Sequence, residues 1–434
     1  MSSTSQDRPD ILLLTVDSLR ADHCGFLNPE CDLTPTLDRL ADDGVVFENA
    51  IAPGPRTPSS MPKIFTGEVF GPRPRVSDMS FRDRKSRIST HLARYRTVAE
   101  RLQDLGYNTA GVTANPWTQR LPGATFEKGF DTLKEVDGAD LLDGDRSHVP
   151  PWLPPVDWVL NTTGVGDRYN WRWKKDWFIQ WPNFYDKISD QLRQTSGPSF
   201  FWAFLLDTHE PYLSPSAYRE ENNAFEMYYA VVKDKLASDG EETFSEADEE
   251  RLRRAYRDAT RSVDNFVATI LEDCANDTVV IFHSDHGEAF GEHGSWGHKS
   301  ELFQENLHVP FFVSGGVQAE RVRQPISLGE IPAMVEKIAS EPIDFDPWSF
   351  TDPLTYATTE NGSKRALCTR EWKYITSPDR TELFSLVDDP GEQHDVSDEH
   401  PELVEHLGQI EQFRRAKTTE RASIAAGVME VEGV

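Results

Sequence analysis

Short runs of apolar residues bounded by polar turns are the feature that most restricts the fold of this chain. The runs occupy residues 11–16, 109–113, 200–206, 278–282 and 309–313. Runs this short, with no alternation of apolar and polar residues, are typical of strands buried on both faces. Segments with helical periodicity lie between them, at residues 34–43, 97–105, 249–272 and 328–338. This alternation predicts an α/β fold with a large, mostly parallel sheet sandwiched by helices.

The pattern changes after about residue 345. Shorter stretches that alternate in polarity precede a last helical segment, and they lie at residues 366–369, 373–376, 382–386 and 401–417. We therefore predict a large domain at residues 1–345 and a small C-terminal α+β subdomain at residues 346–434.

A tryptophan-rich segment near residues 150–182 interrupts the large domain. Six of the eleven tryptophans lie between Trp152 and Trp181, several of them beside Arg or Lys. We predict an insertion or a lid here. The rings either fill a local core, which is the interpretation we favour, or form a surface on which a sugar or lipid stacks.

The charge balance is strongly acidic. The chain has 45 Lys and Arg against 73 Asp and Glu, which gives a net charge of −28 at pH 7. A nucleic-acid-binding protein needs a basic face, so nucleic acid is excluded as a general partner. An evenly acidic surface repels itself at low salt, and this property is associated with halophiles. Our hypothesis is a halophilic protein from a salt-rich cytoplasm.

The sequence also limits the cellular setting. No apolar stretch approaches the ~18 residues of a membrane span, and the first apolar run is too short for a signal peptide. The four cysteines form no CxxC pair, so no disulfide framework is implied. We expect a cytoplasmic protein with no transmembrane segment, and a homo-oligomer remains open.

Polar residues with metal-binding chemistry follow several of the predicted strands. Asp17 follows the first run, His209 lies just beyond the third, and Asp285 and His286 follow the fourth. Each residue alone has a structural interpretation, since Asp often forms turns and a lone His is usually structural. In an open parallel sheet, however, ligands bind outside the carboxyl ends of the strands. Together these side chains predict a cluster that binds a divalent metal.

Thr57 is a candidate nucleophile. Because Pro58 follows it, Thr57 has the sequence context of a helix N-cap, and a helix start presents free N–H groups and a positive dipole end to an anion. By itself, a threonine before proline is more often only a cap. The residues alone leave both interpretations open.

The whole set of motifs resembles the sulfatase branch of the alkaline phosphatase superfamily, over nearly the full chain. The matching segments are residues 17–23, 34–40, 44–47, 284–288, 291–299, 372–374, 382–386 and 389–392. The resemblance implies an alkaline phosphatase-like fold, a sulfatase-like catalytic domain at residues 1–345 and a hydrolase that acts on ester bonds.

The family's usual nucleophile is absent. Familiar sulfatases carry a Cys or Ser, oxidised to formylglycine, in a C-x-P-S-R segment ten residues before a Thr-Gly pair. Counting back from Gly67 leads to Thr57 and places Met61 where the arginine would be. Aligning Pro58 on the family proline would instead select Arg56, which has no nucleophilic group, so we take Thr57. Threonine cannot become formylglycine, so none is expected, and the chain is similar to archaeal-type members that attack through threonine.

The residue type favours phosphorus over sulfur. A formylglycine hydrate expels its sulfate by collapsing to the aldehyde, whereas a sulfated threonine would need a second displacement at sulfur. A phosphothreonine is easier to resolve with a metal and an activated water. We expect hydrolysis of a small-molecule or glycan-linked anionic ester of sulfuric or phosphoric acid, leaning to phosphomonoesters or phosphodiesters. The alternatives are a phosphoglycerol-type transferase and a catalytically silent binding protein.

The resemblance also implies a metal site. Asp17, Asp285 and His286 would hold one divalent cation together with the oxygen of Thr57. Such ligands suit Ca²⁺, Mn²⁺, Mg²⁺ or Zn²⁺, with Ca²⁺ as our first expectation. Ser18 stands where many sulfatases have a second Asp, which implies one cation rather than two.

Three further roles follow from the same resemblance. His209 would contact the transferring group or its leaving oxygen. His298 and Lys299 compete for one place near the leaving group, because counting from Asp285 favours the first and counting from Pro310 the second. Asn115 would hold a non-bridging oxygen of the substrate.

Overall fold

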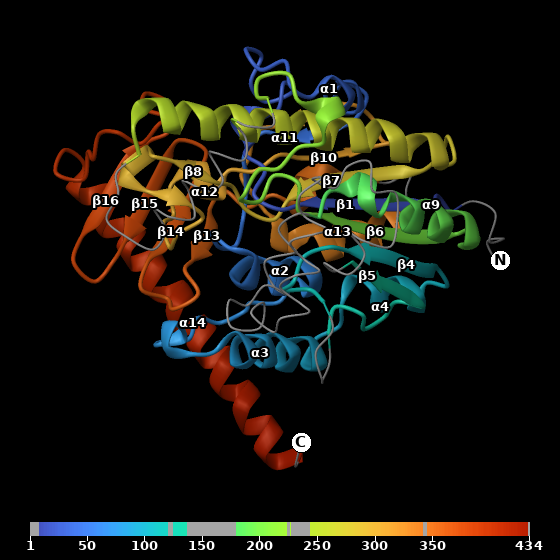
Figure 1. Cartoon of the computed structure of the whole chain (residues 1–434). Helices are drawn as coiled ribbons and strands as arrows, with labels where there is room; N and C mark the ends of the chain where they lie inside the picture. Colours follow the sequence, from blue (N-terminus) through green and yellow to red (C-terminus); the bar gives the residue numbers. More distant parts are fainter. Residues whose placement is uncertain are drawn as a thin grey trace, which may run out of the picture.

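An eight-stranded sheet forms the centre of the molecule (Figure 1). The computed structural model describes residues 8–119, 125–136, 179–223, 226, 244–341 and 345–432. The strands of the large sheet are β1 (Ile11–Val16), β2 (Val45–Phe47), β4 (Asn108–Thr113), β5 (Thr132–Glu135), β6 (Ser199–Leu205), β7 (Val279–Ser284), β10 (Phe311–Ser314) and β11 (Glu320–Val322). Their order is β11-β2-β10-β7-β1-β6-β4-β5. Only β10 runs antiparallel to its neighbours, so the predicted mostly parallel sheet is confirmed.

Strand β1 occupies the middle of this sheet. It pairs in parallel with β6 on one side and β7 on the other, so that Leu13 lies beside Trp202 and Ile281. Every residue of β1 is buried. A strand covered on both faces explains why its sequence is an unbroken apolar run.

Helices cover both faces of the sheet (Figure 1). One face carries α1 (Pro35–Asp42), α9 (Tyr185–Gln194) and α11 (Glu246–Asp273), and the other carries α2 (Thr57–Thr66), α4 (Val98–Asp104) and α13 (Ile331–Ser340), with α3 (Phe81–Arg94) against α2. Side chains of β1 alternate between the two cores. Ile11 and Leu13 pack in the core that contains Met61, and Leu12 packs in the core that contains Val263.

Local sequence signals set the helix ends. Helix α4 begins after Thr97, whose hydroxyl accepts the N–H of Glu100 while the Glu100 carboxylate accepts the N–H of Thr97. Helix α2 ends at Gly67, which has φ 76° in the left-handed region where glycine carries no steric penalty. Short elements complete the large domain: β3 (Ala50–Ile51), β8 (Ala289–Phe290), β9 (Trp296–Gly297), α12 (Gln304–Leu307) and β12 (Ile326–Ser327).

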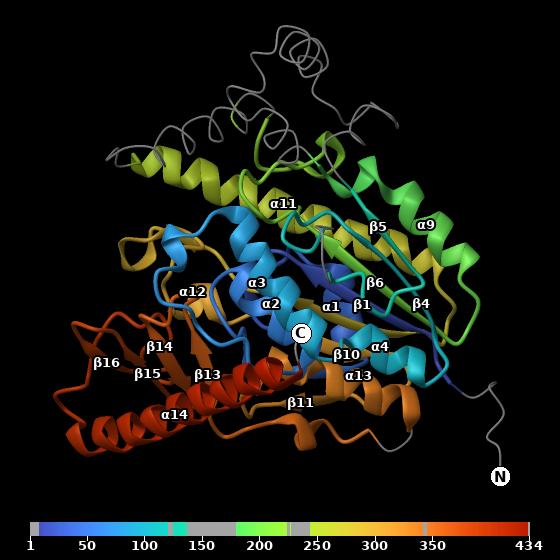
Figure 2. The same ribbon diagram turned by 90° about the horizontal axis from the view of Figure 1, so that it is seen from below.

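A small antiparallel sheet follows near the C-terminus (Figure 2). It contains β13 (Thr355–Thr358), β14 (Arg365–Cys368), β15 (Trp372–Thr376) and β16 (Thr381–Ser385), and helix α14 (Pro401–Glu432) packs on it through Leu407. The small α+β subdomain is therefore confirmed. Helix α14 continues well beyond the predicted end near residue 417, because the following residues include several strong helix formers, such as Ala and Glu.

Most of the tryptophan-rich segment, residues 150–178, lies outside the described residues. Trp181 is buried, stacks on Tyr218 with ring centroids 5.7 Å apart, and donates its indole N–H to the carbonyl of Ser262 at 3.0 Å. This ring fills a local core. Among the described residues, no helix is both long and apolar enough to cross a membrane.

Candidate active site

Two neighbouring strand ends bring the first site residues together. Because Val16 of β1 pairs with Ser284 of β7, the next residues along each strand, Asp17 and Asp285, lie side by side. The N–H of Asp285 donates to the carbonyl of Val16 at 3.1 Å, and the Ser284 hydroxyl accepts the N–H of Leu19 at 2.8 Å. Both carboxylates are fully buried, at 0% exposure.

Asp17, Asp285 and His286 form a cluster with metal-binding geometry. Each offers one ligand atom, and these atoms lie within 4.8 Å of one another. His286 Nε2 lies 3.4 Å from Asp17 Oδ1 and 3.6 Å from Asp285 Oδ2. His286 Nδ1–H donates to the carbonyl of Gly287 at 2.9 Å, so Nε2 directs its lone pair at the carboxylates.

A buried oxygen atom without a hydrogen-bond partner also supports a metal site at this cluster. Oδ2 of Asp285 is buried and has no hydrogen-bond partner among the described residues. A buried polar atom without a partner is costly, and a cation would satisfy it. Carboxylate oxygens with one imidazole fit a divalent cation.

Thr57 is the first residue of α2, and its side chain reaches this cluster. Its Oγ1 lies 3.3 Å from Asp17 Oδ2 and 3.3 Å from His286 Nε2. Of the two interpretations that the sequence left open for Thr57, the structure does not show the helix N-cap. Arg56 occupies that position, because its carbonyl accepts the N–H groups of Ser59 and Ser60 at 2.9 and 3.0 Å. The Thr57 hydroxyl therefore points into the cluster instead of capping the helix.

Asn115 approaches from the end of β4. Its Nδ2 donates to Asp17 Oδ2 and lies 3.5 Å from Thr57 Oγ1. Its Oδ1 accepts the N–H of Trp117 at 2.8 Å, which fixes the orientation of the amide.

Two histidines form the outer side of the site. The ring of His298 lies 4.9 Å from that of His209 and 4.9 Å from that of His286, measured between centroids. His209 Nδ1–H donates to the carbonyl of Glu210 at 2.6 Å, which leaves Nε2 available. The side chain of Lys299 is exposed, and within the described part of the chain no hydrogen bond or ion pair joins it to the cluster. The structure therefore brings His298, but not Lys299, to the other site residues.

The buried charges influence one another. Burial opposes ionisation of Asp17, but His209 and His286 outweigh that effect and lower its pKa. Burial, with the charge of Asp17 beside it, raises the pKa of Asp285 well above its usual range. Burial lowers the pKa of both His286 and His298 to about 3. Burial also disfavours charge on His209, yet Asp17 and neighbouring glutamates raise its pKa.

Sequence reasoning missed two residues that support the site. Glu288 is fully buried, and both its carboxyl oxygens lie 3.2 Å from His298 Nδ1. Its place two residues after His286 was an available signal. The Tyr256 hydroxyl accepts the N–H of Arg20 at 2.9 Å and donates to the carbonyl of Ser18 at 2.7 Å, which fixes the turn after β1. Tyr256 gave no signal, because it occupies an ordinary apolar position of a helix.

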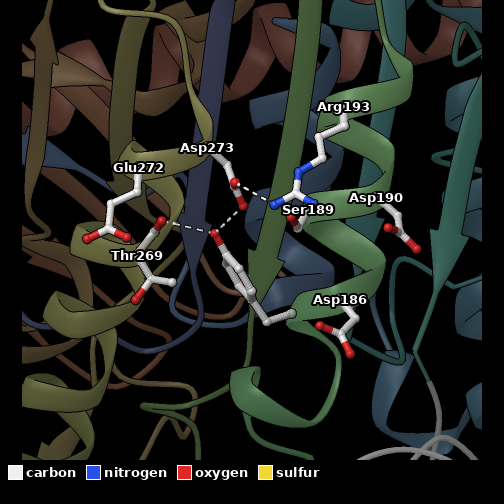
Figure 3. A pocket seen from close by; sticks show the side chains of 8 residues that line it. Asp186, Ser189, Asp190, Arg193, Thr269, Glu272 and Asp273 are labelled. Atoms are coloured by element: carbon white, nitrogen blue, oxygen red, sulfur yellow. Dashed lines mark hydrogen bonds and ion pairs between the residues drawn. The ribbon is translucent and has the colours of Figure 1, made fainter.

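A separate polar pocket of about 510 Å³ lies between α9 and α11 (Figure 3). Its lining residues are Tyr185, Asp186, Ser189, Asp190, Arg193, Thr269, Glu272 and Asp273. Thr269 lies about 20 Å along α11 from Tyr256, at 1.5 Å per residue. Asp273 ends α11 just before β7 begins, so the pocket lies toward the amino ends of the strands and is distinct from the site.

Comparison with known proteins agrees with this geometry. The sequence model of the sulfatase family matches residues 9–339. Arylsulfatase K of Danio rerio is 22% identical over 458 residues, which cover 94% of this chain and 84% of that protein. A choline-sulfatase of Rhizobium meliloti (strain 1021) is 24% identical over 441 residues, which cover 88% of this chain and 81% of that protein.

Solved structures share the fold. The phosphonate monoester hydrolase of Agrobacterium radiobacter aligns with a TM-score of 0.65 and 17% identity, over 95% of this chain and 96% of that one. A 2-O GAG sulfatase aligns with a TM-score of 0.67 and 15% identity, over 96% of this chain and 94% of that one. The alkaline phosphatase-like sheet and its ester-hydrolase relatives define the class of protein: a hydrolase that acts on ester bonds. Within this class, the chain belongs to the sulfatase family.

Proposed function

We propose that this hydrolase cleaves sulfuric or phosphoric esters through Thr57, with a preference for phosphomonoesters or phosphodiesters. One observation carries the proposal: the Thr57 hydroxyl lies 3.3 Å from both Asp17 and His286, inside the cluster. A nucleophile beside such a cluster has the arrangement that metal-assisted displacement requires.

A single divalent cation fits the donor set. Asp17, Asp285, His286 and the Thr57 oxygen would hold it, and Ca²⁺, Mn²⁺, Mg²⁺ and Zn²⁺ all suit these ligands. When bound, the cation would lower the pKa of the Thr57 hydroxyl and offset negative charge on the ester. The Ser18 hydroxyl donates to Asp17 Oδ1 at 2.8 Å, so the residue at the family's second Asp position supports the first carboxylate.

The residues suggest a double displacement. Thr57 Oγ1 forms a bond to phosphorus as the bond from phosphorus to the leaving oxygen breaks. The Thr57 proton is lost to solvent, and His209 gives a proton to the leaving oxygen. Water then attacks phosphorus and the bond to Thr57 breaks. His209 takes a proton from that water, and Thr57 regains a proton from solvent.

The remaining groups position the substrate. Asn115 Nδ2, beside both Asp17 and Thr57, is placed to donate to a non-bridging oxygen. His298 borders the leaving-group side, with Nδ1 held against Glu288. The names of two similar proteins support two ester classes. The choline-sulfatase supports a sulfate ester as substrate, and the phosphonate monoester hydrolase supports an ester of phosphorus. We infer a small-molecule or glycan-linked anionic ester, and threonine chemistry favours phosphorus.

Turnover of nitrophenyl sulfate, phosphate monoester, phosphodiester and phosphonate in molar KCl, each with several divalent cations, tests the proposal. Thr57→Ala should lose about 10³-fold or more of kcat on the best ester, as removal of a nucleophile does. Thr90→Ala, at an exposed position of α3, is the matched control and should keep full activity. Mass spectrometry after acid quenching should find phosphate on Thr57.

Full activity in Thr57→Ala would refute this nucleophile. Product transfer to an added alcohol in preference to water would identify a transferase. Absence of turnover together with absence of cation binding would favour a binding protein. The net charge of −28 supports a further proposal about the setting, a salt-rich cytoplasm.

A further inference from the structure

The loop after β4 carries Asn115 and fixes its amide. The Asn115 carbonyl accepts the N–H of Thr118 at 3.1 Å, and its Oδ1 accepts the N–H of Trp117 at 2.8 Å. These bonds direct Nδ2 at Asp17 and Thr57, the groups that it meets in the site. The position of this donor in the site therefore depends on the shape of the loop.

Lys85, on α3, closes this loop. Its Nζ donates to the carbonyls of Pro116 and Gln119, each at 2.7 Å, and only 7% of the residue is exposed. In the sequence the two carbonyls lie on either side of Trp117 and Thr118, the residues whose N–H groups orient the site amide. Lysine is rarely buried without partners, and hydrogen bonds from a charged donor are short and strong. One ammonium group therefore holds both ends of that turn.

Helix α3 is itself fixed to α2, the helix that begins at Thr57. His91 Nε2 lies 3.0 Å from Thr66 Oγ1 at the end of α2, and Ile88 packs in the same apolar core as Met61. Through α3, the lysine connects the helix that carries the proposed nucleophile with the loop that carries the proposed substrate donor.

The side chains next to Lys85 on α3 contact the same loop. The guanidinium of Arg84 lies over the ring of Trp117, 4.6 Å from its centroid, and the Phe81 ring lies 4.5 Å from that of Trp117, measured between centroids. These contacts hold the tryptophan side chain, whereas Lys85 binds the backbone on both sides of it. Loss of the backbone bonds would therefore allow the peptide between them to turn.

We propose that Lys85 is a positioning residue, which sets the place of the Asn115 amide in the active site. This inference rests on the proposed function, in which Asn115 Nδ2 donates to a non-bridging oxygen of the ester. Among the described residues, no hydrogen bond or ion pair joins Lys85 to Thr57 or to the metal-binding cluster. Its effect on turnover therefore passes through the loop. A displacement of about 1 Å in a group that positions the substrate can cost about 10²-fold in rate.

A double-mutant cycle between Lys85 and Asn115 tests this role. The kcat/KM on the best ester is measured for the full chain with Mn²⁺ in molar KCl. Asn115→Ala should lose about 10²-fold, as removal of a transition-state donor does, and Lys85→Met should lose about tenfold or more. The double variant should be no worse than Asn115→Ala, because the amide that Lys85 positions is already gone. Losses that multiply, or full activity in Asn115→Ala, would overturn the proposal.

Hydrogen exchange measures the loop without requiring turnover. In Lys85→Met, the peptide that contains the Trp117 and Thr118 amides should exchange about tenfold faster or more, whereas α2 should be unchanged. Lys85→Arg retains a charged donor group and should lose less activity than Lys85→Met. If Lys85→Met fails to fold, Lys85→Gln, which keeps a neutral donor, replaces it in the cycle. Arg82→Gln removes an exposed cation from α3 and should match wild type in both measurements.

The proposed nucleophile is tested separately. If Thr57→Ala retains turnover while the cycle is non-additive, the nucleophile is wrong and the role of Lys85 stands. If Thr57→Ala loses turnover while Lys85→Met keeps wild-type activity and exchange, only the role of Lys85 is wrong. If no ester is turned over, the same cycle is run on the calorimetric affinity for benzylphosphonate. Losses of affinity that multiply, or absence of binding, would then overturn the proposal.

Discussion

Asp207 is a buried carboxyl group two residues before His209. Its Oδ1 accepts the N–H of Trp181 at 3.4 Å, and its Oδ2 has no hydrogen-bond partner among the residues described. Burial raises its pKa from 3.8 to about 7. Between these values the unfolded chain loses the proton while the folded protein keeps it, so the free energy of unfolding falls as the pH rises from 3.8 to about 7.

Asp207→Asn should remove this pH dependence, because the amide resembles the protonated acid. Relative to wild type, the variant should gain up to about 4 kcal/mol in the free energy of unfolding between pH 4 and pH 8, at 1.36 kcal/mol per pKa unit. Urea unfolding at several pH values measures the difference. Parallel curves for the two proteins would show that Asp207 does not titrate in this interval.

At the residue scale, sequence reasoning found the groups whose spacing carries information. Asp17 and Asp285 were predictable because they follow apolar strands, and Thr57 because of its distance from Gly67. Tyr256 was not, since its role depends on its hydrogen bonds with Arg20 and Ser18, which are distant in the chain. The choice between His298 and Lys299 needed the position of the loop after β9, which spacing alone does not fix.

At the scale of elements, α12 supports the segment that carries Asp285 and His286, through its contact with Gly287. The N–H of Gly287 donates to the carbonyl of Asn306 at 2.9 Å, and a Cβ at this position would lie 2.1 Å from the carbonyl oxygen of Glu305. The obstructing atoms belong to the backbone, so relief requires α12 to move. If Gly287 shifts as well, His286 would shift with it, because the Nδ1–H of His286 donates a hydrogen bond to the Gly287 carbonyl.

Gly287→Ala should therefore weaken Mn²⁺ binding by roughly 10-fold to 100-fold, as loss of a group that orients a ligand does. Gly71→Ala is the matched control, because a Cβ there meets nothing within 4 Å. Calorimetric titration with Mn²⁺ gives the two affinities. Wild-type affinity in Gly287→Ala would mean that α12 does not position His286.

The elements themselves were largely predictable. The predicted bounds of the buried strands agree with β1 fully and with β6 and β7 to within about two residues, because both faces of these strands are apolar. The antiparallel direction of β10 was not predictable, since an apolar run reads the same whichever way the strand runs. Its direction is set by tertiary pairing with Phe282 and Val46.

At the scale of the whole molecule, a buried ion pair inside the C-terminal subdomain holds the carboxylate that contacts α12. Lys373 Nζ lies 3.1 Å from Glu392 Oε1, and both side chains are fully buried. Glu392 Oε2 accepts the N–H of Gln304, the first residue of α12, at 2.6 Å. The C-terminal subdomain thereby reaches the helix that packs against Gly287, so the site depends on both parts of the chain. Composition and periodicity predict the large domain and the C-terminal subdomain, but not the contact between Glu392 and Gln304.

The net charge of −28 acts on the whole molecule and predicts how its stability depends on salt. Like charges spread over a compact surface repel one another, and unfolding relieves that repulsion by moving them apart. At molar salt the Debye length falls to about 3 Å, which screens charges separated by more than that distance. The temperature of half-unfolding should therefore rise between low and molar KCl.

A charge-reduced variant provides the control. Glu371, Asp379 and Asp398 are exposed, and replacing them with Gln, Asn and Asn lowers the repulsion without touching the core. This triple variant should gain stability at low KCl and respond less steeply to added salt, with the two proteins converging near molar KCl. Thermal unfolding followed by circular dichroism measures both slopes. If wild-type stability does not rise with KCl, repulsion between surface charges does not measurably destabilise the folded protein. The proposal of a salt-rich setting then loses its physical basis.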